Sequence, residues 1–266
     1  MPILRIRLLG GFNLSYDDSP VQAINTARLH SLLAYLLLHR DVPQRRQHLA
    51  FLFWPDAGEV QARNNLRQML HQFRHLLPAV EDFLYADTNT LHWRDDAPFS
   101  LDVADFEQAL TRADAAEQLH ERDSRHAALT EAISLYRGDL LPSCYDEWIV
   151  PERDRLRQRY LGTVGSLVNL LEGLHDYGAA IRYAHAWSRH DPLAEDAHRV
   201  FMRLLALTED RAGALHVYQS CVTILRRELG VEPSRATRDL YQRLLCMDAP
   251  PVPAVRRLAA HCRTPA

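Results

Sequence analysis

The sequence predicts a mainly helical protein with an α+β N-terminal part and an all-α C-terminal part. Three observations predict this fold class: strand-like alternation is confined to the first hundred residues, a strongly two-faced helix lies among them, and amphipathic helices alone follow. We expect a winged helix-turn-helix over residues 1–98 and tetratricopeptide-like helical repeats over residues 99–247. A chain of 266 residues is long enough for two such domains, each with its own core.

Two short strands open the chain. Residues 4–8 (LRIRL) alternate apolar and polar side chains, Gly10-Gly11 interrupts the pattern, and residues 12–16 (FNLSY) resume it. Residues 17–20 (DDSP) have the composition of a turn. We therefore expect a small antiparallel sheet ahead of the first helix.

Three helices and a hairpin follow. The first helix begins after Thr26, a suitable N-cap, and ends near Arg40; the second begins after Pro43 and ends before Trp54, whose side chain we expect in the core. The third covers residues 59–77, and two short strands around a polar turn at residues 87–90 come next. This order of elements is typical of a winged helix.

The third helix is the predicted DNA-recognition helix because its two faces differ chemically. At 100° per residue one face is apolar, whereas the other collects amides, histidines and arginines, which suit hydrogen bonding to base edges in the major groove. The alternative, an amphipathic helix whose arginines contact only water, stays open. The residues predicted to contact bases are Asn64, Arg67, Gln68 and His71.

The local charge around the third helix also supports its assignment as the recognition helix. The formal net charge is −3, but from residue 44 to residue 75 five arginines face only two acids, Asp56 and Glu59. A segment with this excess of positive charge favours binding to the phosphates of a nucleic acid. His71 and His75 are spaced as a metal-binding pair, but no third ligand has suitable spacing, so we expect neither metal nor cofactor.

The residue inventory argues against catalysis. All 31 Lys and Arg positions are arginine, which excludes a Walker A or Schiff-base lysine in this chain. No nucleophile triad, metal cluster or glycine-rich phosphate loop stands out, so we expect no enzyme. The scattered cysteines indicate free thiols, and the longest apolar run, residues 32–38, is too short to cross a bilayer. These features predict a cytoplasmic protein without membrane contact.

The second half of the sequence reads as helices joined by short turns. We expect helices over 103–120, 123–137, 151–174, 177–190, 193–207, 211–229 and 233–245. The residues Ala179-Ala180-Ile181 recur as Gly213-Ala214-Leu215 at an offset of 34, the tetratricopeptide period. Such stacked helix pairs suit contact with a partner. Residues 248–266 begin with a proline-rich linker composition and end in a short stretch, around residues 256–258, that is helical or disordered.

Several motifs resemble those of bacterial transcriptional activators of the antibiotic-regulatory-protein (SARP) type. These proteins join an OmpR-type winged helix to a bacterial transcriptional activator domain, and the resemblance covers nearly everything before the tail. The motifs here are residues 9–12 (LGGF), 33–37 (LAYLL), 52–56 (LFWPD), 62–67 (ARNNLR), 136–141 (YRGDLL), 147–148 (EW) and 227–233 (RELGVEP).

The resemblance implies a function: sequence-specific binding of double-stranded promoter repeats, with homodimers on DNA and recruitment of RNA polymerase. It also implies phosphate contacts from helix starts and from the wing. An alternative has Arg63 or Asn65 bracing the loop at residues 54–56 instead. The residues predicted to contact the DNA backbone are Arg28, Gln44, Arg45, Arg46, Arg63, Arg74, His75, Asn89, Thr90 and Arg94.

Two alternative functions stay open. The chain is a protein-interaction module that has lost DNA binding, or it is the N-terminal regulatory part of a larger nucleotide-binding regulator of the STAND type. Acids in place of arginines on the third helix would indicate the interaction module, and the sequence has arginines there.

Overall fold

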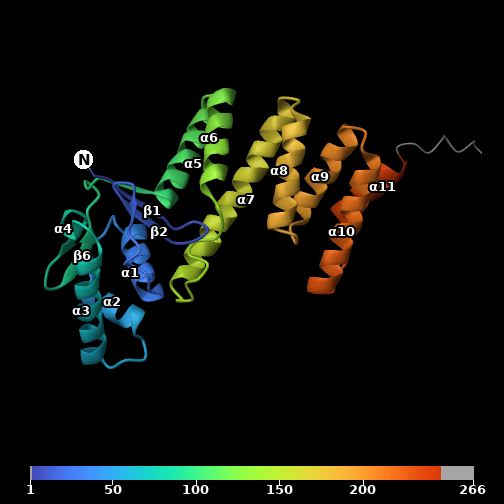
Figure 1. Ribbon diagram of the computed structural model, residues 1–266. Helices are drawn as coiled ribbons and strands as arrows, with labels where there is room; N and C mark the ends of the chain where they lie inside the picture. The colour runs from blue at the N-terminus through green and yellow to red at the C-terminus, as the bar shows by residue number, and fades with distance from the viewer. Residues whose placement is uncertain (1, 247–266) are drawn as a thin grey trace, which may run out of the picture. The chain divides into compact units, whose positions relative to one another are not determined.

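The computed structural model describes residues 2–246 (Figure 1). The chain forms two compact units, Met1–Leu170 and Leu171–Ala266, which divide within a single long helix. The predicted fold class is confirmed, since a small β-containing region precedes a succession of helices. The tail predicted at 248–266 lies outside the described residues. Within residues 2–246, no helix combines the length and the apolar character that crossing a membrane requires.

A four-stranded sheet opens the first unit. Strands β1 (Leu4–Arg7), β2 (Asn13–Tyr16), β3 (Ser19–Pro20) and β7 (Phe99–Leu101) lie in the order β3-β2-β1-β7. The β1–β2 pair is antiparallel, as predicted, and Leu4 and Ile6 are buried while their neighbours are exposed. The sequence pattern missed β7, which pairs in parallel with β1, because three residues are too few for a periodicity to emerge.

Helices α1 (Ala27–Leu38), α2 (Arg46–Phe53) and α3 (Glu59–Leu76) follow. Thr26 caps α1 as predicted, its hydroxyl oxygen accepting a hydrogen bond from Leu29 N at 3.3 Å. The prediction that Trp54 is a core residue was wrong: it is half-buried, and the Arg28 guanidinium lies 5.8 Å from the centre of its ring. The neighbouring Phe53 occupies the core instead.

The predicted hairpin consists of β5 (Leu84–Ala86) and β6 (Thr90–Trp93), preceded by a short helix, α4 (Val80–Phe83), that the sequence did not indicate. A third strand, β4 (Gln44–Arg45), pairs with β6, so the sheet order is β4-β6-β5. Trp93 is fully buried and stacks on Phe83 with 5.9 Å between ring centres. Trp93 also packs edge-to-face against Phe99 with 5.8 Å between ring centres, so this packing joins the base of the hairpin to β7.

The rest of the first unit contains α5 (Asp102–Gln118), α6 (Arg122–Leu135) and most of α7 (Ile149–Gly173). Figure 1 shows α5 and α6 side by side. The Asp102 carboxylate joins α5 to the end of β1 by accepting hydrogen bonds from Leu8 N and Leu9 N at 2.9 Å. The winged helix therefore connects to the helical region through buried hydrogen bonds.

The second unit contains α8 (Tyr177–His190), α9 (Glu195–Leu207), α10 (Arg211–Leu229) and α11 (Arg235–Cys246). The repeat predicted from sequence extends to the caps: Asp176 accepts from Ala179 N, and Asp210 accepts from Gly213 N. Ala180 and Ala214 are both fully buried. Both pairs keep the offset of 34 residues, which agrees with tetratricopeptide-like packing.

Candidate nucleic-acid interface

Helix α3 has the two faces that its sequence predicted. Its apolar residues Ala62, Leu66, Met69, Leu70 and Phe73 are buried. All four residues predicted to contact bases, Asn64, Arg67, Gln68 and His71, are exposed. The packing of α3 against the core thus leaves a row of amide, guanidinium and imidazole groups at the surface.

The turn between β5 and β6 is organised by one carboxylate. Asp87 Oδ1 accepts hydrogen bonds from Asn89 N at 2.7 Å and from Thr90 N at 2.6 Å, while Asp87 Oδ2 accepts from the Thr90 hydroxyl at 3.0 Å. These bonds, that from Asn89 N foremost, hold the pKa of Asp87 below its usual value. The turn is therefore shaped by its own side chain.

Arg46 attaches this turn to the start of α2. Its backbone N–H donates to Asn89 O at 2.8 Å, and its Nη1 donates to Asp87 O at 2.8 Å. Because the strand pair β4–β6 lies beside these bonds, the hairpin turn and the first residues of α2 form one surface.

A hollow of about 650 Å³ lies between α2, α3 and the hairpin turn. Six residues predicted to contact DNA meet around it, although they come from three separate segments of the sequence. They are Arg45, Arg46, Arg63, Arg67, Asn89 and Thr90.

The hollow is strongly cationic. Burial, followed by the positive charges of Arg74 and Arg67, lowers the pKa of Arg46, while Asp87 acts in the opposite direction. Arg63 pairs with Glu59 at 2.5 Å, but Arg45 and Arg67 form no ion pair with any residue from 2 to 246. An anion such as a phosphate would relieve this repulsion.

Other predicted backbone contacts lie apart from the hollow. Arg28 pairs with Asp146 at 3.2 Å, and the Gln44 amide donates to Val42 O at 2.9 Å. Arg94 lines a different depression with Asp95 and Asp96, where carboxylates surround it. Fourteen residues were predicted to contact DNA. The side chains of these three already have partners or carboxylates beside them within the protein, so they are the least suited of the fourteen to bind a phosphate.

The C-terminal half of α3 carries a second group. The rings of His71 and His75 are in contact, with 3.2 Å between their Nε2 atoms, and together with Arg74 they line a shallow depression beside Glu81. Among residues 2–246 there is no cluster of three or more side chains suited to hold a metal ion. The alternative had Arg63 or Asn65 bracing the loop at 54–56. In the structure Arg63 pairs instead with Glu59 at 2.5 Å, and Asn65 Oδ1 accepts from Gln61 Nε2 at 2.8 Å.

Sequence reasoning missed three contributors to the hollow and its shape: Gln47, Thr88 and Asp87. Thr88 and Asp87 lie in the turn that the sequence identified, and Gln47 follows Arg46 in the first turn of α2. The sequence did carry a signal for the role of Asp87. The polar turn begins with this Asp, and an Asp in that position commonly accepts a hydrogen bond from the backbone N–H two residues ahead.

Comparisons with known proteins agree with this architecture. Residues 101–245 match the family of the bacterial transcriptional activator domain. The chain is 28% identical over 264 residues to the regulatory protein AfsR of Streptomyces coelicolor and 24% identical over 245 residues to that of Streptomyces griseus. These matches cover 97% and 92% of this chain, but only 25% of either relative.

A solved structure has the same fold. That structure is Mycobacterium tuberculosis EmbR in complex with a low-affinity phosphopeptide, with a TM-score of 0.74 and 21% sequence identity. The similarity covers 92% of this chain and 65% of EmbR. The matched domain and the shared fold agree with the sequence motifs, and the chain belongs to the bacterial transcriptional activator domain family.

Proposed function

We propose that the chain binds double-stranded DNA sequence-specifically, with α3 in the major groove and the β5–β6 turn on the adjacent backbone. The observation that carries this proposal is the cationic hollow of about 650 Å³ beside the exposed polar face of α3. Arginine and amide side chains on α3 supply base contacts, and the arginines around the hollow neutralise a phosphate. In winged-helix proteins the recognition helix usually contacts the bases while the wing contacts the adjacent DNA.

The partners follow from the same proposal. The regulator binds promoter repeats as a homodimer and contacts RNA polymerase, and the helical region supplies dimer and partner contacts. Because the chain spans a quarter of the length of its AfsR relatives, these roles belong to the proposal, as does the alternative that it acts as the N-terminal part of a larger regulator.

The first test is a selection of random duplex DNA with the purified chain, followed by binding of the selected sequences across a salt series. We expect a repeated motif, with affinity falling steeply as salt rises. The variant Arg67→Ala/Gln68→Ala should lose the preference for that motif, because both side chains are exposed on α3.

A matched control removes the same two residue types elsewhere. Gln118 and Arg122 are exposed in the α5–α6 pair, so Gln118→Ala/Arg122→Ala should keep the preference. An unaltered motif in the α3 variant would refute the assignment of α3 as recognition helix. If no motif is enriched from the library, the interaction-module alternative is favoured instead.

A further inference from the structure

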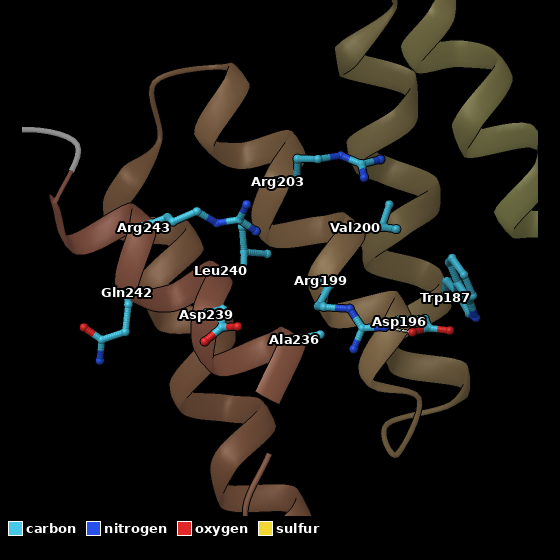
Figure 2. A pocket seen from close by; sticks show the side chains of 10 residues that line it. All are labelled: Trp187, Asp196, Arg199, Val200, Arg203, Ala236, Asp239, Leu240, Gln242 and Arg243. Carbon is cyan, nitrogen blue, oxygen red and sulfur yellow. Dashed lines mark ion pairs between the residues drawn. The ribbon is translucent and has the colours of Figure 1, made fainter. Parts of the chain in front are cut away.

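A groove of about 970 Å³ lies between α9 and α11 in the second unit (Figure 2). Helix α9 contributes Arg199, Val200 and Arg203, and α11 contributes Leu240 and Arg243. Figure 2 shows Arg243 towards one end of the groove and Trp187, from α8, towards the other. None of these residues belongs to the candidate nucleic-acid interface.

The three arginines differ in how far they are already engaged. Arg199 pairs with Asp196 and donates to the Thr237 hydroxyl at 3.0 Å, so it is part of the helix packing. Arg203 pairs with Glu172 through one nitrogen at 2.6 Å, and 47% of its side chain stays exposed. Arg243 is exposed and makes neither an ion pair nor a side-chain hydrogen bond with any residue from 2 to 246.

Besides the arginines, the groove is lined by apolar side chains and by the polar groups of Asp196, Asp239 and Gln242. Trp187, Val200 and Leu240 are half-buried, which leaves part of each side chain accessible. A ligand that fits this surface carries carboxylates for the guanidinium groups and apolar side chains for the wall between them. An acidic peptide segment with interspersed apolar residues has that chemistry.

Charge argues against two other occupants. The chain's own residues 247–266 contain three arginines and a single acid, Asp248, so a cationic groove repels them. A nucleic acid presents a continuous row of phosphates, and the carboxylates of Asp196 and Asp239 line the groove among the arginines. A peptide can place its carboxylates selectively, whereas a phosphate backbone cannot.

We propose that the groove between α9 and α11 binds a short acidic segment of a partner protein, with carboxylates on Arg243 and Arg203 and apolar side chains against Leu240 and Val200. This interaction is separate from the proposed DNA binding. It gives the second unit a docking surface for a protein partner.

The test uses the full chain and a displayed library of random 12-residue peptides. We expect enrichment of peptides that combine Asp or Glu with Leu, Ile or Phe. A selected peptide is then labelled and its Kd measured by fluorescence anisotropy, beside a version with Gln and Asn in place of its acids. The acidic peptide should bind at least tenfold more tightly than the amide version.

Two charge reversals on α11 locate the site. Arg243→Glu should weaken peptide binding at least tenfold, whereas Arg238→Glu, an exposed position on the same helix outside the groove, should change it less than twofold. Leu240→Ser should also weaken binding, and circular dichroism checks that each variant is folded. DNA binding by Arg243→Glu should equal that of the wild type, so failure of one proposal is distinguishable from failure of the other.

Several outcomes would overturn the proposal. The peptide selection would contradict it by enriching no peptides or by enriching basic ones. Equal losses of peptide affinity in Arg243→Glu and Arg238→Glu would indicate a nonspecific effect of net charge. A chain ending at residue 246 that binds the peptide more than tenfold better would place the tail in the groove. Displacement of the peptide by duplex DNA would assign the groove to nucleic acid, and a dimer abolished by Arg243→Glu would assign it to a second copy.

Discussion

Gly10 and Gly138 lie backbone against backbone: a Cβ atom added to Gly138 would be 3.1 Å from Gly10 Cα. Gly10 has a φ of +82°, and its N–H donates to Asp139 O at 3.0 Å. Both glycines belong to motifs that carry the sequence resemblance, residues 9–12 near the N-terminus and residues 136–141 between α6 and α7. In this chain a side chain at either position would therefore press on the backbone of the other motif.

Replacing Gly10 with alanine should destabilise the first unit. The new Cβ would lie 3.0 Å from Arg137 backbone atoms, and a left-handed φ is unfavourable for a residue with a Cβ. We expect a loss of about 1–3 kcal/mol in the free energy of unfolding, measured by urea denaturation. As a control, Gly162→Ala in α7, where a Cβ meets nothing within 4 Å, should leave stability equal or higher. Equal stability of Gly10→Ala and wild type would show that the close approach is not required.

A buried hydroxyl provides a second link between the winged helix and the helical region. Ser31 in α1 is fully buried, accepts from Trp148 Nε1 at 3.1 Å, and donates to the Asp146 carboxylate. Ser31→Ala leaves both partners without this bond, so we expect about 1–3 kcal/mol lower stability. Ser124→Ala, at an exposed position in α6, is the matched control and should unfold at the wild-type urea concentration. If Ser31→Ala and Ser124→Ala unfold at the same urea concentration, the Ser31 hydroxyl does not stabilise the link between the winged helix and the helical region.

These links also show where sequence reasoning ends. Periodicity predicted α3, α8 and α10 nearly to the residue, because a long amphipathic helix repeats its signal many times. It missed β4 and β7, whose two or three residues gain their strand geometry from pairing with β6 and β1. Arg28 resembled other exposed arginines until Asp146, distant in the sequence, proved to be its partner. The exposure of α3 was predictable, but the hollow formed with Asn89 required tertiary structure.

The helix caps of the second unit should be equivalent in energy. Asp176 and Asp210 each accept a hydrogen bond from the N–H three residues ahead, at 3.0 Å and 2.8 Å. Each Asp→Ala substitution should cost about 1 kcal/mol, observed as a lower thermal midpoint. Asp→Asn should recover most of the loss, because the amide oxygen still accepts. A loss at one position alone would show that the two repeats are not equivalent.

The turn of the β5–β6 hairpin should lose order in acid. Asp87 has a lowered pKa in the folded chain, so its contribution is complete above the unfolded value near pH 3.8 and is lost as pH falls through the lower folded value. The amide resonances of Asn89 and Thr90 should shift together in an NMR titration, with a midpoint below 3.8. A midpoint at or above 3.8 would contradict the hydrogen-bonded turn. In Asp87→Ala these two resonances should show no such titration.

If the hollow between α2, α3 and the hairpin turn holds a DNA phosphate, Arg45 should contribute to the salt dependence of binding. Arg45 is exposed, lines the hollow and forms no ion pair with the described residues. Arg45→Ala should weaken binding to all duplexes alike and reduce the slope of log affinity against log salt by about 0.9, the value for one phosphate contact. Arg7→Ala, an exposed arginine at the end of β1 outside the hollow, should leave the slope unchanged. If Arg45→Ala has the same slope of log affinity against log salt as the wild type, Arg45 does not contact a phosphate. If its affinity falls only for the selected motif, Arg45 contacts a base and not the DNA backbone.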